Sequence, residues 1–457
     1  MRLSRFVVST FALAALVLAL AFGCQAQTVA TLYNFGATSA SEGPAYVTPV
    51  QARNGEIYGT TAGPQGIDGS IFALSVSGRL AEPYIFSDAA SPAGGLTLGS
   101  DGYLYGTSYT GGGFGSGYLF KISPASVFTD LHDFQDGSDG ATPYSPPIQA
   151  SDGNFYGTTF GAGGASTIYK YETGGTFTTI LSLSTSQGAE LADPLIQGSD
   201  GNLYGTAFVG GATGCGTVFK VSTGGEMLWN YSFPCGSGGA SPFGPLVQGA
   251  DGNYYGTTES GGAYDNYGTV FKLDSTSGNV SILHRFDYFD GNNIFSGLTQ
   301  GTDGNLYGVA ASGGKAGFGT LFSISLGGVF KLLYNFGVSG KTPYSAPLQD
   351  TNGIFYGTTY AGGHYGYGTA YSLNMELGPF VAFVQPDAKV GQTAEILGQG
   401  LTGTSAVVFD GVAATEFSVV NDTYMTAVVP SGATTGPVVV TTPGGALTSN
   451  VSFRIIN

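Results

Sequence analysis

The sequence predicts an all-β protein, with a seven-bladed β-propeller over residues 28–378 followed by a small immunoglobulin-like β-sandwich over residues 379–457. A heptapeptide of the form Asp-Gly-Asn-Leu-Tyr-Gly-Thr occurs seven times, and its copies begin 47 to 52 residues apart. A period of this length is typical of repeat architectures such as propellers. After residue 378 the repeat stops and short alternating strands continue to the end of the chain, over about the length of one sandwich domain.

Residues 1–27 are predicted to be a signal peptide. Arg2 and Arg5 precede an apolar run at residues 6–22, which is long enough for the core of an export signal. Two outcomes of processing stay open, namely cleavage after Ala26 or a lipoprotein-type cleavage that leaves Cys24 as the lipid-bearing first residue. We therefore expect the protein outside the cytoplasm or at the cell surface, in contact with a membrane only through a lipid on Cys24.

Each repeat is predicted to contain four short strands, as the fourth copy shows at residues 194–197, 203–207, 216–221 and 228–233. Asp200-Gly201 supplies the tight turn before the second strand. Gly205 is a glycine in all seven copies, which predicts a close approach of another backbone or a sharp bend. The third strand carries an aromatic residue in every copy: Phe72, Phe120, Tyr169, Phe219, Phe271, Phe322 and Tyr371.

The two ends of the propeller are predicted to join. Residues 32–35 (Leu-Tyr-Asn-Phe) match residues 333–336, where a fourth, outer strand is expected. The seventh repeat has only its first three strands before Gly378-Pro379. We therefore expect residues 30–35 to supply the missing outer strand of the last blade.

Cys215 and Cys235 are predicted to form a cross-strand disulfide. They flank the third and fourth strands of the fourth repeat, with the turn Gly224-Gly225 midway between them. In an oxidising compartment such a pair forms a disulfide. A catalytic or metal-binding pair is the alternative, but no CxxC spacing or nearby histidine favours it.

The sequence resembles two known families. The succession of the heptapeptide, Gly-Gly and Gly-Thr-Val-Phe-Lys is similar to the GloVer tandem repeats of exported bacterial proteins. Residues 398, 429–430, 434–436 and 441–445 resemble an IPT/TIG domain, an immunoglobulin-like fold. The first resemblance implies no assigned activity. The DNA-binding role of some TIG domains does not transfer, because Lys389 and Arg454 are the only basic residues here, and we expect a spacer or adhesive module.

Charge excludes one class of partner. With Arg2 and Arg5 removed, 12 basic residues face 30 acidic ones, which gives a net charge of −18. Nucleic acid is not expected as a partner, because its affinity depends on lysines and arginines that neutralise phosphates. The protein is expected to be a monomer.

No cofactor or metal site is predicted. His132 and His284 occupy fourth-strand positions where other repeats have tyrosine, so we interpret them as strand residues. The turn aspartates lie a whole repeat apart and are expected to form turns. The denser acidic loops at residues 136–139 and 287–290 offer too few carboxylates for the six to eight oxygen ligands of Ca²⁺. No phosphate loop, nucleophile elbow or zinc signature is present.

The loops between second and third strands are the predicted ligand-binding surface. They present aromatic rings and one histidine among glycines, which can face sugars or pack on neighbouring blades. The residues are Tyr109, Phe114, Phe160, Phe208, Tyr264, Tyr267, Phe318, Tyr360, His364, Tyr365 and Tyr367. Glu259 and Asp265 are two carboxylates close together in one such loop, and they are the candidate acid and base of a glycosidase or lyase.

Two functions follow from these patterns. The favoured hypothesis is a non-enzymatic exported protein whose propeller loops bind a polysaccharide or protein at the cell surface. The alternative is a carbohydrate-active propeller enzyme, a glycosidase or lyase. A cleft that gathers carboxyl groups would distinguish the second from the first.

Overall fold

The computed structural model describes residues 28–36, 43–44, 46, 48–61, 68–87, 90–92, 94–161, 166–262 and 266–456. The signal-peptide prediction and Cys24 lie outside these residues. The described chain is all-β, and its one helical element is the 3-10 turn Gly236–Gly238. No helix in these ranges is long and apolar enough to cross a membrane.

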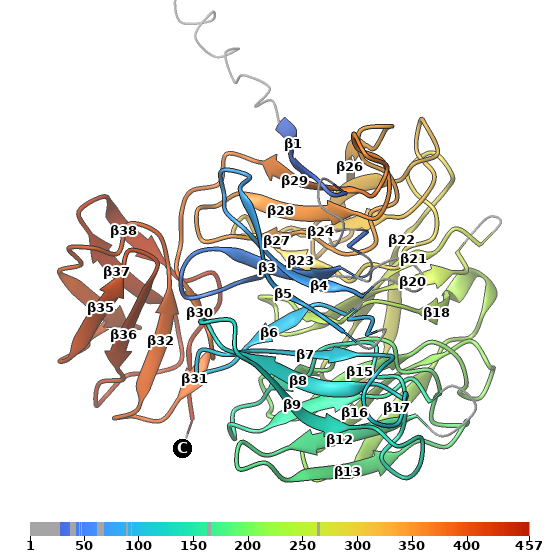
Figure 1. The fold of residues 1–457 in the computed structure, drawn as a ribbon, viewed down its shortest axis with the longest axis horizontal. Helices are drawn as coiled ribbons and strands as arrows, with labels where there is room; N and C mark the ends of the chain where they lie inside the picture. The colour runs from blue at the N-terminus through green and yellow to red at the C-terminus, as the bar shows by residue number, and fades with distance from the viewer. Residues whose placement is uncertain are drawn as a thin grey trace, which may run out of the picture.

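Antiparallel four-stranded sheets follow one another along the chain in a propeller-like arrangement. Figure 1 shows these sheets side by side, with the C-terminal strands on the left. We number them sheet 1 to sheet 7 in chain order. Sheet 5 carries β18 (Ala240–Pro242) as an additional strand on β20. The first three sheets are sheet 1 with β2 (Val50–Gln51), β3 (Ile57–Thr61), β4 (Ser70–Leu74) and β5 (Leu80–Ile85); sheet 2 with β6 (Leu96–Leu98), β7 (Leu104–Ser108), β8 (Tyr118–Ile122) and β9 (Phe128–Asp133); and sheet 3 with β10 (Ile148–Gln149), β11 (Phe155–Thr158), β12 (Thr167–Tyr171) and β13 (Phe177–Ser182). The next two are sheet 4 with β14 (Ile196–Gln197), β15 (Leu203–Ala207), β16 (Thr217–Val221) and β17 (Met227–Ser232), and sheet 5 with β19 (Val247–Gln248), β20 (Tyr254–Ser260), β21 (Thr269–Leu273) and β22 (Val280–Arg285). The last two are sheet 6 with β23 (Thr299–Gln300), β24 (Leu306–Ala310), β25 (Thr320–Ile324) and β26 (Phe330–Asn335), and sheet 7 with β27 (Leu348–Gln349), β28 (Phe355–Thr359), β29 (Thr369–Asn374) and β1 (Thr28–Asn34).

The N-terminal strand completes the last sheet. β1 pairs antiparallel with β29, from Thr28 opposite Asn374 to Asn34 opposite Thr369. The predicted donation of an outer strand by residues 30–35 is therefore confirmed, and the strand begins two residues earlier than expected.

A repeated glutamine joins neighbouring sheets. Gln149 in the first strand of sheet 3 accepts a hydrogen bond of 2.8 Å from the backbone N–H of Ser100, in the turn of sheet 2. It donates its own amide to the carbonyl of Gly153. The same acceptor role recurs at Gln197, Gln248, Gln300, Gln349 and Gln51. Because Gln51 accepts from Thr351, the series runs from sheet 7 back to sheet 1.

The recurring strand glycine has a different cause from the predicted one. Gly205 lies directly opposite Phe219 of the third strand, and a β-carbon at Gly205 would come within 2.6 Å of the Phe219 ring. Gly106 and Phe120 repeat the arrangement at 2.5 Å. The glycine therefore makes room for an aromatic side chain of the same sheet, and not for another backbone.

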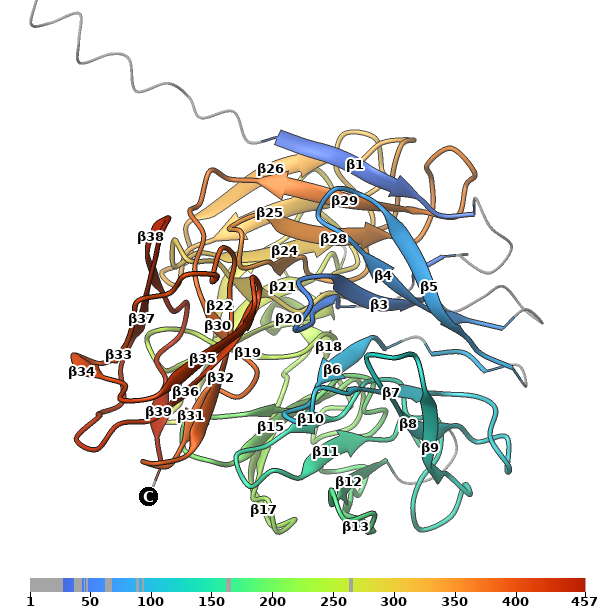
Figure 2. The ribbon, with the colours of Figure 1, turned by 60° about the vertical axis from the view of Figure 1, so that its left-hand side comes forward.

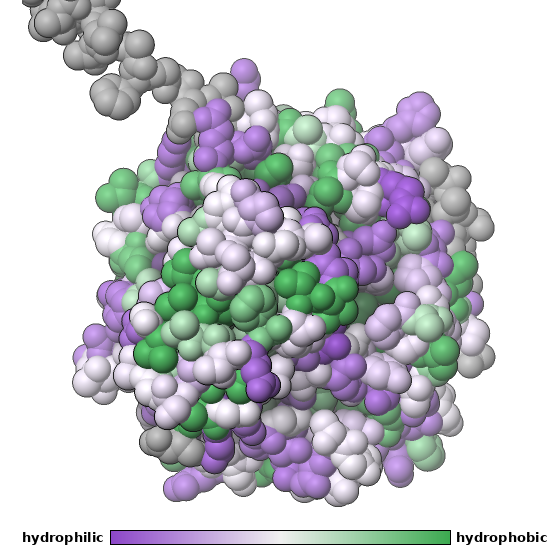
Figure 3. Space-filling model, turned by 90° about the vertical axis from the view of Figure 1, so that its left-hand side faces the viewer, coloured by the Kyte–Doolittle hydropathy of each residue, from purple (hydrophilic) through white to green (hydrophobic). Residues whose placement is uncertain are grey.

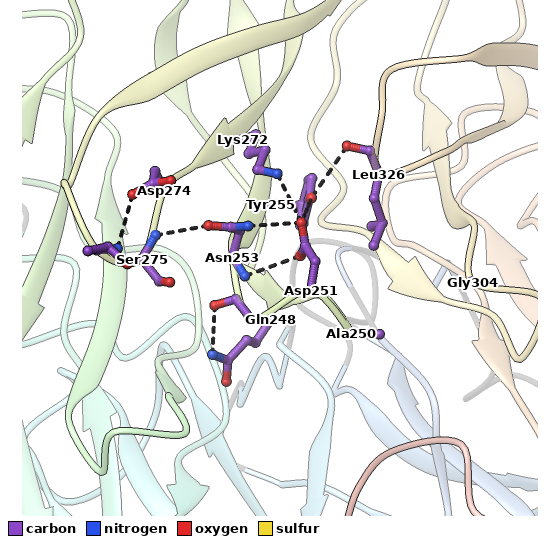
Figure 4. Close-up of polar contacts among 12 residues, drawn as sticks. Gln248, Ala250, Asp251, Asn253, Tyr255, Lys272, Asp274, Ser275, Gly304 and Leu326 are labelled. Carbon is purple, nitrogen blue, oxygen red and sulfur yellow. Dashed lines mark hydrogen bonds and ion pairs between the residues drawn. The ribbon is translucent and has the colours of Figure 1, made fainter.

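The heptapeptide aspartates form turns, as predicted. Asp251 accepts the backbone N–H of Asn253 and the hydroxyl of Tyr255, and Lys272 forms an ion pair with it at 2.9 Å (Figure 4). This network fixes the turn between the first two strands and ties it to the third. Several bonds to the charged form hold the pKa of Asp251 down, at about 2, against the opposing effect of burial.

Residues after 378 form a separate core. The strands are β30 (Ala382–Phe383), β31 (Asp387–Ala388), β32 (Thr393–Leu397), β33 (Ala406–Phe409), β34 (Val412–Ala413), β35 (Phe417–Asn421), β36 (Tyr424–Val428), β37 (Val438–Thr442), β38 (Gly445–Thr448) and β39 (Arg454–Ile455). They make two four-stranded sheets, β30-β32-β36-β35 and β34-β33-β37-β38, and one parallel pair of β31 and β39. We call β30 to β39 the C-terminal module.

The C-terminal module packs against the end of the sheets where the heptapeptide turns lie (Figure 2). Arg53 of the sheet 1 turn pairs with Glu395 at 2.6 Å, and Gln385 donates to Gln149 of sheet 3 at 3.2 Å. Arg454 donates to the carbonyl of Gly198 in sheet 4 at 3.0 Å. The expectation of a spacer is corrected, because a module bonded to several sheets cannot act as a free stalk. Hydrophobic residues gather near the centre of the molecular face on this side (Figure 3).

Candidate functional site

A cavity of about 380 Å³ lies where the innermost strands of all seven sheets converge. Each sheet contributes residues at or just before its first strand. The C-terminal module contributes Phe383, Val384 and Leu397. The sheet residues that line the cavity are Thr48, Pro49, Val50, Gln51, Gly94, Leu96, Thr97, Leu98, Tyr144, Ser145, Pro146, Ile148, Ala192, Asp193, Pro194, Leu195, Ile196, Phe243, Gly244, Pro245, Phe295, Ser296, Gly297, Tyr344 and Ser345, with Tyr46 from the preceding segment.

Four aromatic rings form a collar at the cavity. Tyr46 stacks on Tyr344 with ring centroids 4.6 Å apart, and Phe295 lies 5.6 Å from Tyr344. Phe243 lies 5.4 Å from Phe295 and 5.7 Å from Tyr46. We call Tyr46, Phe243, Phe295 and Tyr344 the aromatic collar. Their positions immediately precede first strands, so the collar lies away from the turns that the C-terminal module contacts.

The collar is incomplete on the side of sheets 2 to 4. Ala192 lines the cavity at the position where sheets 3, 5, 6 and 7 carry a ring, and Gly94 lines it on the side of sheet 2. Tyr144 does have a ring, but that ring stacks on Tyr109 at 4.8 Å and lies 5.1 Å from Phe160. The wall that sheet 4 contributes therefore carries no ring at this level.

Asp193 is the acidic residue among the described residues that line the cavity. It lies just before β14 and is 8% exposed. Thr206 donates its hydroxyl to Asp193 Oδ2 at 3.0 Å, and the backbone N–H of Gly244 also donates to the carboxyl group. Burial raises the pKa of Asp193 to about 7 although both bonds oppose the shift. A group with this pKa can give or take a proton at neutral pH.

Asp193 was missed from the sequence, although the repeat carries a signal for it. Four of the six other copies have an aromatic residue and then serine or glycine at this point, namely Tyr144-Ser145, Phe243-Gly244, Phe295-Ser296 and Tyr344-Ser345. The fourth copy has Ala192-Asp193. The departure from the repeat removes a collar ring and introduces a buried carboxyl group at neighbouring positions.

The predicted acid–base pair lies elsewhere. Glu259, in β20, does not line the cavity, but its charge helps to raise the pKa of Tyr46 in the collar, after the larger effect of burial. Burial raises the pKa of Glu259 itself. Asp265 lies outside the described residues, so the pair stays a prediction.

The predicted ligand-binding residues fall into two groups. Tyr109, Phe160, Phe208 and Tyr360 pack on rings at the cavity; for Phe208 the partner is Phe243, and for Tyr360 it is Tyr344. Six others lie farther out: Phe114, Tyr365 and Tyr367 are exposed, and His364 contacts Tyr365. Tyr267 contacts Tyr288, and the ring of Phe318 lies under the ammonium group of Lys341. Tyr264 lies outside the described residues.

The remaining polar candidates have structural partners. His132 in β9 stacks on Phe177 at 3.6 Å and bonds Asp139 at 3.1 Å. His284 in β22 likewise stacks on Phe330 and forms a hydrogen bond with Asp290. Both are strand residues, as predicted, and one carboxylate of each acidic loop is bonded to them. In the described part of the chain no group of three histidine, cysteine, aspartate or glutamate side chains is placed to hold a metal ion.

The predicted disulfide is present. Cys215 and Cys235 are bonded, with Cα atoms 5.5 Å apart. A disulfide of this kind is typical of proteins from oxidising compartments, which agrees with export.

Comparisons with known proteins identify the repeats and the fold. The model of the Gloeobacter/Verrucomicrobia repeat family matches residues 21–166 and 146–371. The chain is similar to the WD40 β-propeller domain of Doa1, with a TM-score of 0.51 and 10% identity over 75% of this chain and 97% of that one. No curated protein matches.

Two further similar structures are named as lactonases. The periplasmic gluconolactonase PpgL of Pseudomonas aeruginosa has a TM-score of 0.47 and 17% identity over 70% of this chain and 97% of that one. A putative 6-phosphogluconolactonase of Bacteroides uniformis has a TM-score of 0.45 and 14% identity over 70% and 99%. At these identities the likenesses concern the fold.

The expectation of a non-enzymatic binding protein is corrected by this finding. The similar structures include one named as a gluconolactonase and one named as a putative 6-phosphogluconolactonase, names that stand with the alternative, a carbohydrate-active propeller enzyme, and not with the binding protein. The chemistry itself has to come from this chain's own residues.

Proposed function

Because the chain belongs to the Gloeobacter/Verrucomicrobia repeat family, we propose that its repeats are the seven blades of a closed propeller and that it is an exported, carbohydrate-active enzyme. In this proposal residues 379–457 are an immunoglobulin-like module of the IPT/TIG kind. The two sheets of the module share one apolar core that includes Ile396, Met425 and Val440, which supports a sandwich.

Asp193 carries the proposal. It is a buried carboxyl group on the wall of a cavity, with a pKa of about 7, and a perturbed carboxyl group in a pocket is a candidate general acid or base. The cavity volume of about 380 Å³ lies at the lower end of the roughly 300–1,000 Å³ of small-ligand pockets. Aromatic rings beside it offer faces on which a sugar ring can stack.

The number of carboxyl groups selects the reaction. Hydrolysis of a glycosidic bond commonly uses two carboxyl groups, about 5 to 10 Å apart. Among the described residues that line the cavity, only Asp193 carries one. Ring opening of a sugar lactone needs one base, which takes a proton from water as the water oxygen attacks the carbonyl carbon. The acyl C–O bond of the ring then breaks, and the ring oxygen leaves as a hydroxyl with the proton that the same carboxyl group returns. The proposed substrate is therefore a sugar lactone, and the product is the open-chain hydroxy acid.

Substitution at Asp193 tests the function. Asp193→Asn keeps the size of the side chain and removes its proton transfer, so kcat/KM for D-glucono-1,5-lactone is expected to fall by about 100-fold or more. Asp152→Asn is the matched control, because Asp152 forms a turn with Asn154 and does not line the cavity. The proposal is contradicted if the wild-type protein does not raise the rate of lactone hydrolysis above the spontaneous rate, or if the Asp193→Asn variant keeps its activity.

The pH dependence gives a second test. A general base must be ionised, so kcat/KM is expected to decline as the pH falls through about 7, the pKa of Asp193. Rates measured between pH 5 and pH 8, corrected for spontaneous hydrolysis, check this. A profile that is flat over this range contradicts the role of Asp193.

A further inference from the structure

We propose that the C-terminal module is the closed floor of the cavity and that Phe383 limits the substrate to a single sugar ring. The size limit rests on the function proposed above, whereas the floor does not. Phe383, Val384 and Leu397 line the cavity together with the seven sheets. They come from the module, which lies at the turn end of the sheets, whereas the aromatic collar precedes the first strands.

The floor is held on two sides. Within the module, Phe383 in β30 pairs with Ile396 of β32, and its ring lies 4.9 Å from the ring of Phe453. Two residues further on, Gln385 donates to the side chain and backbone carbonyls of Gln149 at 3.2 and 3.4 Å. The segment that closes the cavity is therefore fixed both to the core of the module and to sheet 3.

The same region of the ring holds the proposed base. Arg454 of the module forms an ion pair with Asp387 and donates to the carbonyl of Gly198, in the turn that follows β14 of sheet 4. Asp193 lies just before β14. The module thus contacts sheet 4 at the far end of the strand whose near end carries Asp193, so the depth of the cavity below Asp193 is set by the module.

A closed floor leaves the collar end as the entrance. Ala192 lines the cavity without a ring on the side of sheet 4, and Asp193 follows Ala192 directly. A sugar ring that enters there reaches the carboxyl group and then meets Phe383 and Leu397. A second ring on the far side of the reacting lactone has no space, because Phe383 packs against the core of the module and Leu397 is buried against sheets 1 and 2.

Substrate length tests the role of Phe383. Wild-type protein is expected to prefer D-glucono-1,5-lactone to the two-ring cellobiono-1,5-lactone by about 10-fold or more in kcat/KM, and Phe383→Ala is expected to reduce this preference severalfold. Phe417→Ala is the matched control, because Phe417 is an exposed aromatic residue of the same module on β35. An unchanged preference in Phe383→Ala overturns the size limit.

Cysteine labelling tests the floor without any catalysis. Thr97→Cys places a thiol in the wall of the cavity. The labelled protein also carries Cys24→Ser, and its other two native cysteines, Cys215 and Cys235, are joined in the disulfide, so the new thiol is the one that reacts. Phe383→Gly is expected to raise the rate of labelling by a charged methanethiosulfonate severalfold, and Phe417→Gly is expected to leave the rate unchanged. Equal rates in all three proteins overturn the floor. Faster labelling without lactone turnover by the wild type supports the floor and overturns the proposed function.

Discussion

The seam between sheets 1 and 2 differs from the other six seams of the ring. At those six, a glutamine of one sheet accepts a backbone N–H from the turn of the preceding sheet. At the seam of sheets 1 and 2 the equivalent residue is Leu98, which pairs with Leu104 as the glutamines pair with their partners. Leu98 packs in one apolar cluster with Leu397 and Tyr424 of the C-terminal module.

The difference shows that the C-terminal module replaces a missing bridge. Arg53, in the turn of sheet 1, donates to the carbonyl of Ser100 in sheet 2 at 2.7 Å and forms an ion pair with Glu395 at 2.6 Å. Thr423 donates to the backbone carbonyl of Arg53 at 2.8 Å. A repeat architecture therefore tolerates the loss of its repeated contact at one seam, because a non-repeated module packs there.

Among the changes that test the difference between the seams, removal of the C-terminal module is expected to lower the free energy of unfolding most. A chain that ends at residue 378 exposes Leu98 and its apolar neighbours and loses the bonds to Arg53. We expect a loss of roughly 5 kcal/mol in the free energy of unfolding. Urea unfolding of both chains measures it. Hydrogen exchange should rise first in β3 and β6, and a uniform rise over all sheets would show that seam 1/2 is not special.

Asp350 makes the stability of the protein at sheet 7 dependent on pH. It is fully buried in the turn of sheet 7, and Gln399 of the module donates to it at 3.4 Å. Burial raises its pKa to about 6 from the ordinary 3.8. The folded protein therefore binds this proton more tightly than the unfolded chain, so the contribution of Asp350 to stability is highest below pH 4 and declines as the pH rises to about 6.

The size of this decline is measurable. The Asp350 contribution is expected to be on the order of 2 to 3 kcal/mol between pH 4 and pH 7. Asp350→Asn should remove that part of the pH dependence, whereas Asp303→Asn, in a turn that does not contact the module, should leave it. Parallel pH profiles of unfolding for wild type and Asp350→Asn would contradict the assignment.

The ion pair at the seam of sheets 1 and 2 is expected to contribute less than Asp350 to the free energy of unfolding. Arg53 and Glu395 are about three-quarters buried or more, so Arg53→Met leaves the Glu395 carboxylate partly buried without its cation. We expect a loss of roughly 2 kcal/mol, between the values for exposed and buried pairs. Arg79→Met is the control, because the Arg79–Glu56 pair is mostly exposed at Arg79. Thermal unfolding of the two variants distinguishes them, and equal losses would argue against a bridge at Arg53.

A single glutamine is expected to have the smallest effect. Gln300→Leu turns the seam of sheets 5 and 6 into one like seam 1/2, but without a module to cover it. Gln300 bonds Ala250 and Gly304 at 3.0 and 3.1 Å, and the loss is expected to be about 1 kcal/mol. The urea midpoint measures it. A stabilised variant would mean that the glutamines do not bridge the seams.

The repeat itself was visible in the sequence. The turn aspartates, the third-strand aromatics and the match between residues 32–35 and 333–336 predicted the strands and the pairing of β1 with β29. These features are local, or they recur in seven copies, so each copy supports the interpretation of the others. The disulfide of Cys215 and Cys235 was predictable for the same reason, since the two residues flank one hairpin.

The cavity was decided by the tertiary structure. Ring contacts such as Tyr46 with Phe243 join residues about two hundred positions apart. The period repeats these rings, but it does not specify that their side chains meet at one cavity. The burial that raises the pKa of Asp193 and the position of Phe383 beneath the cavity exist only once the sheets and the C-terminal module have packed. The sequence by itself determined the repeating unit, because backbone turns and alternating strands are written locally, whereas burial and long-range contact were settled by the assembled fold.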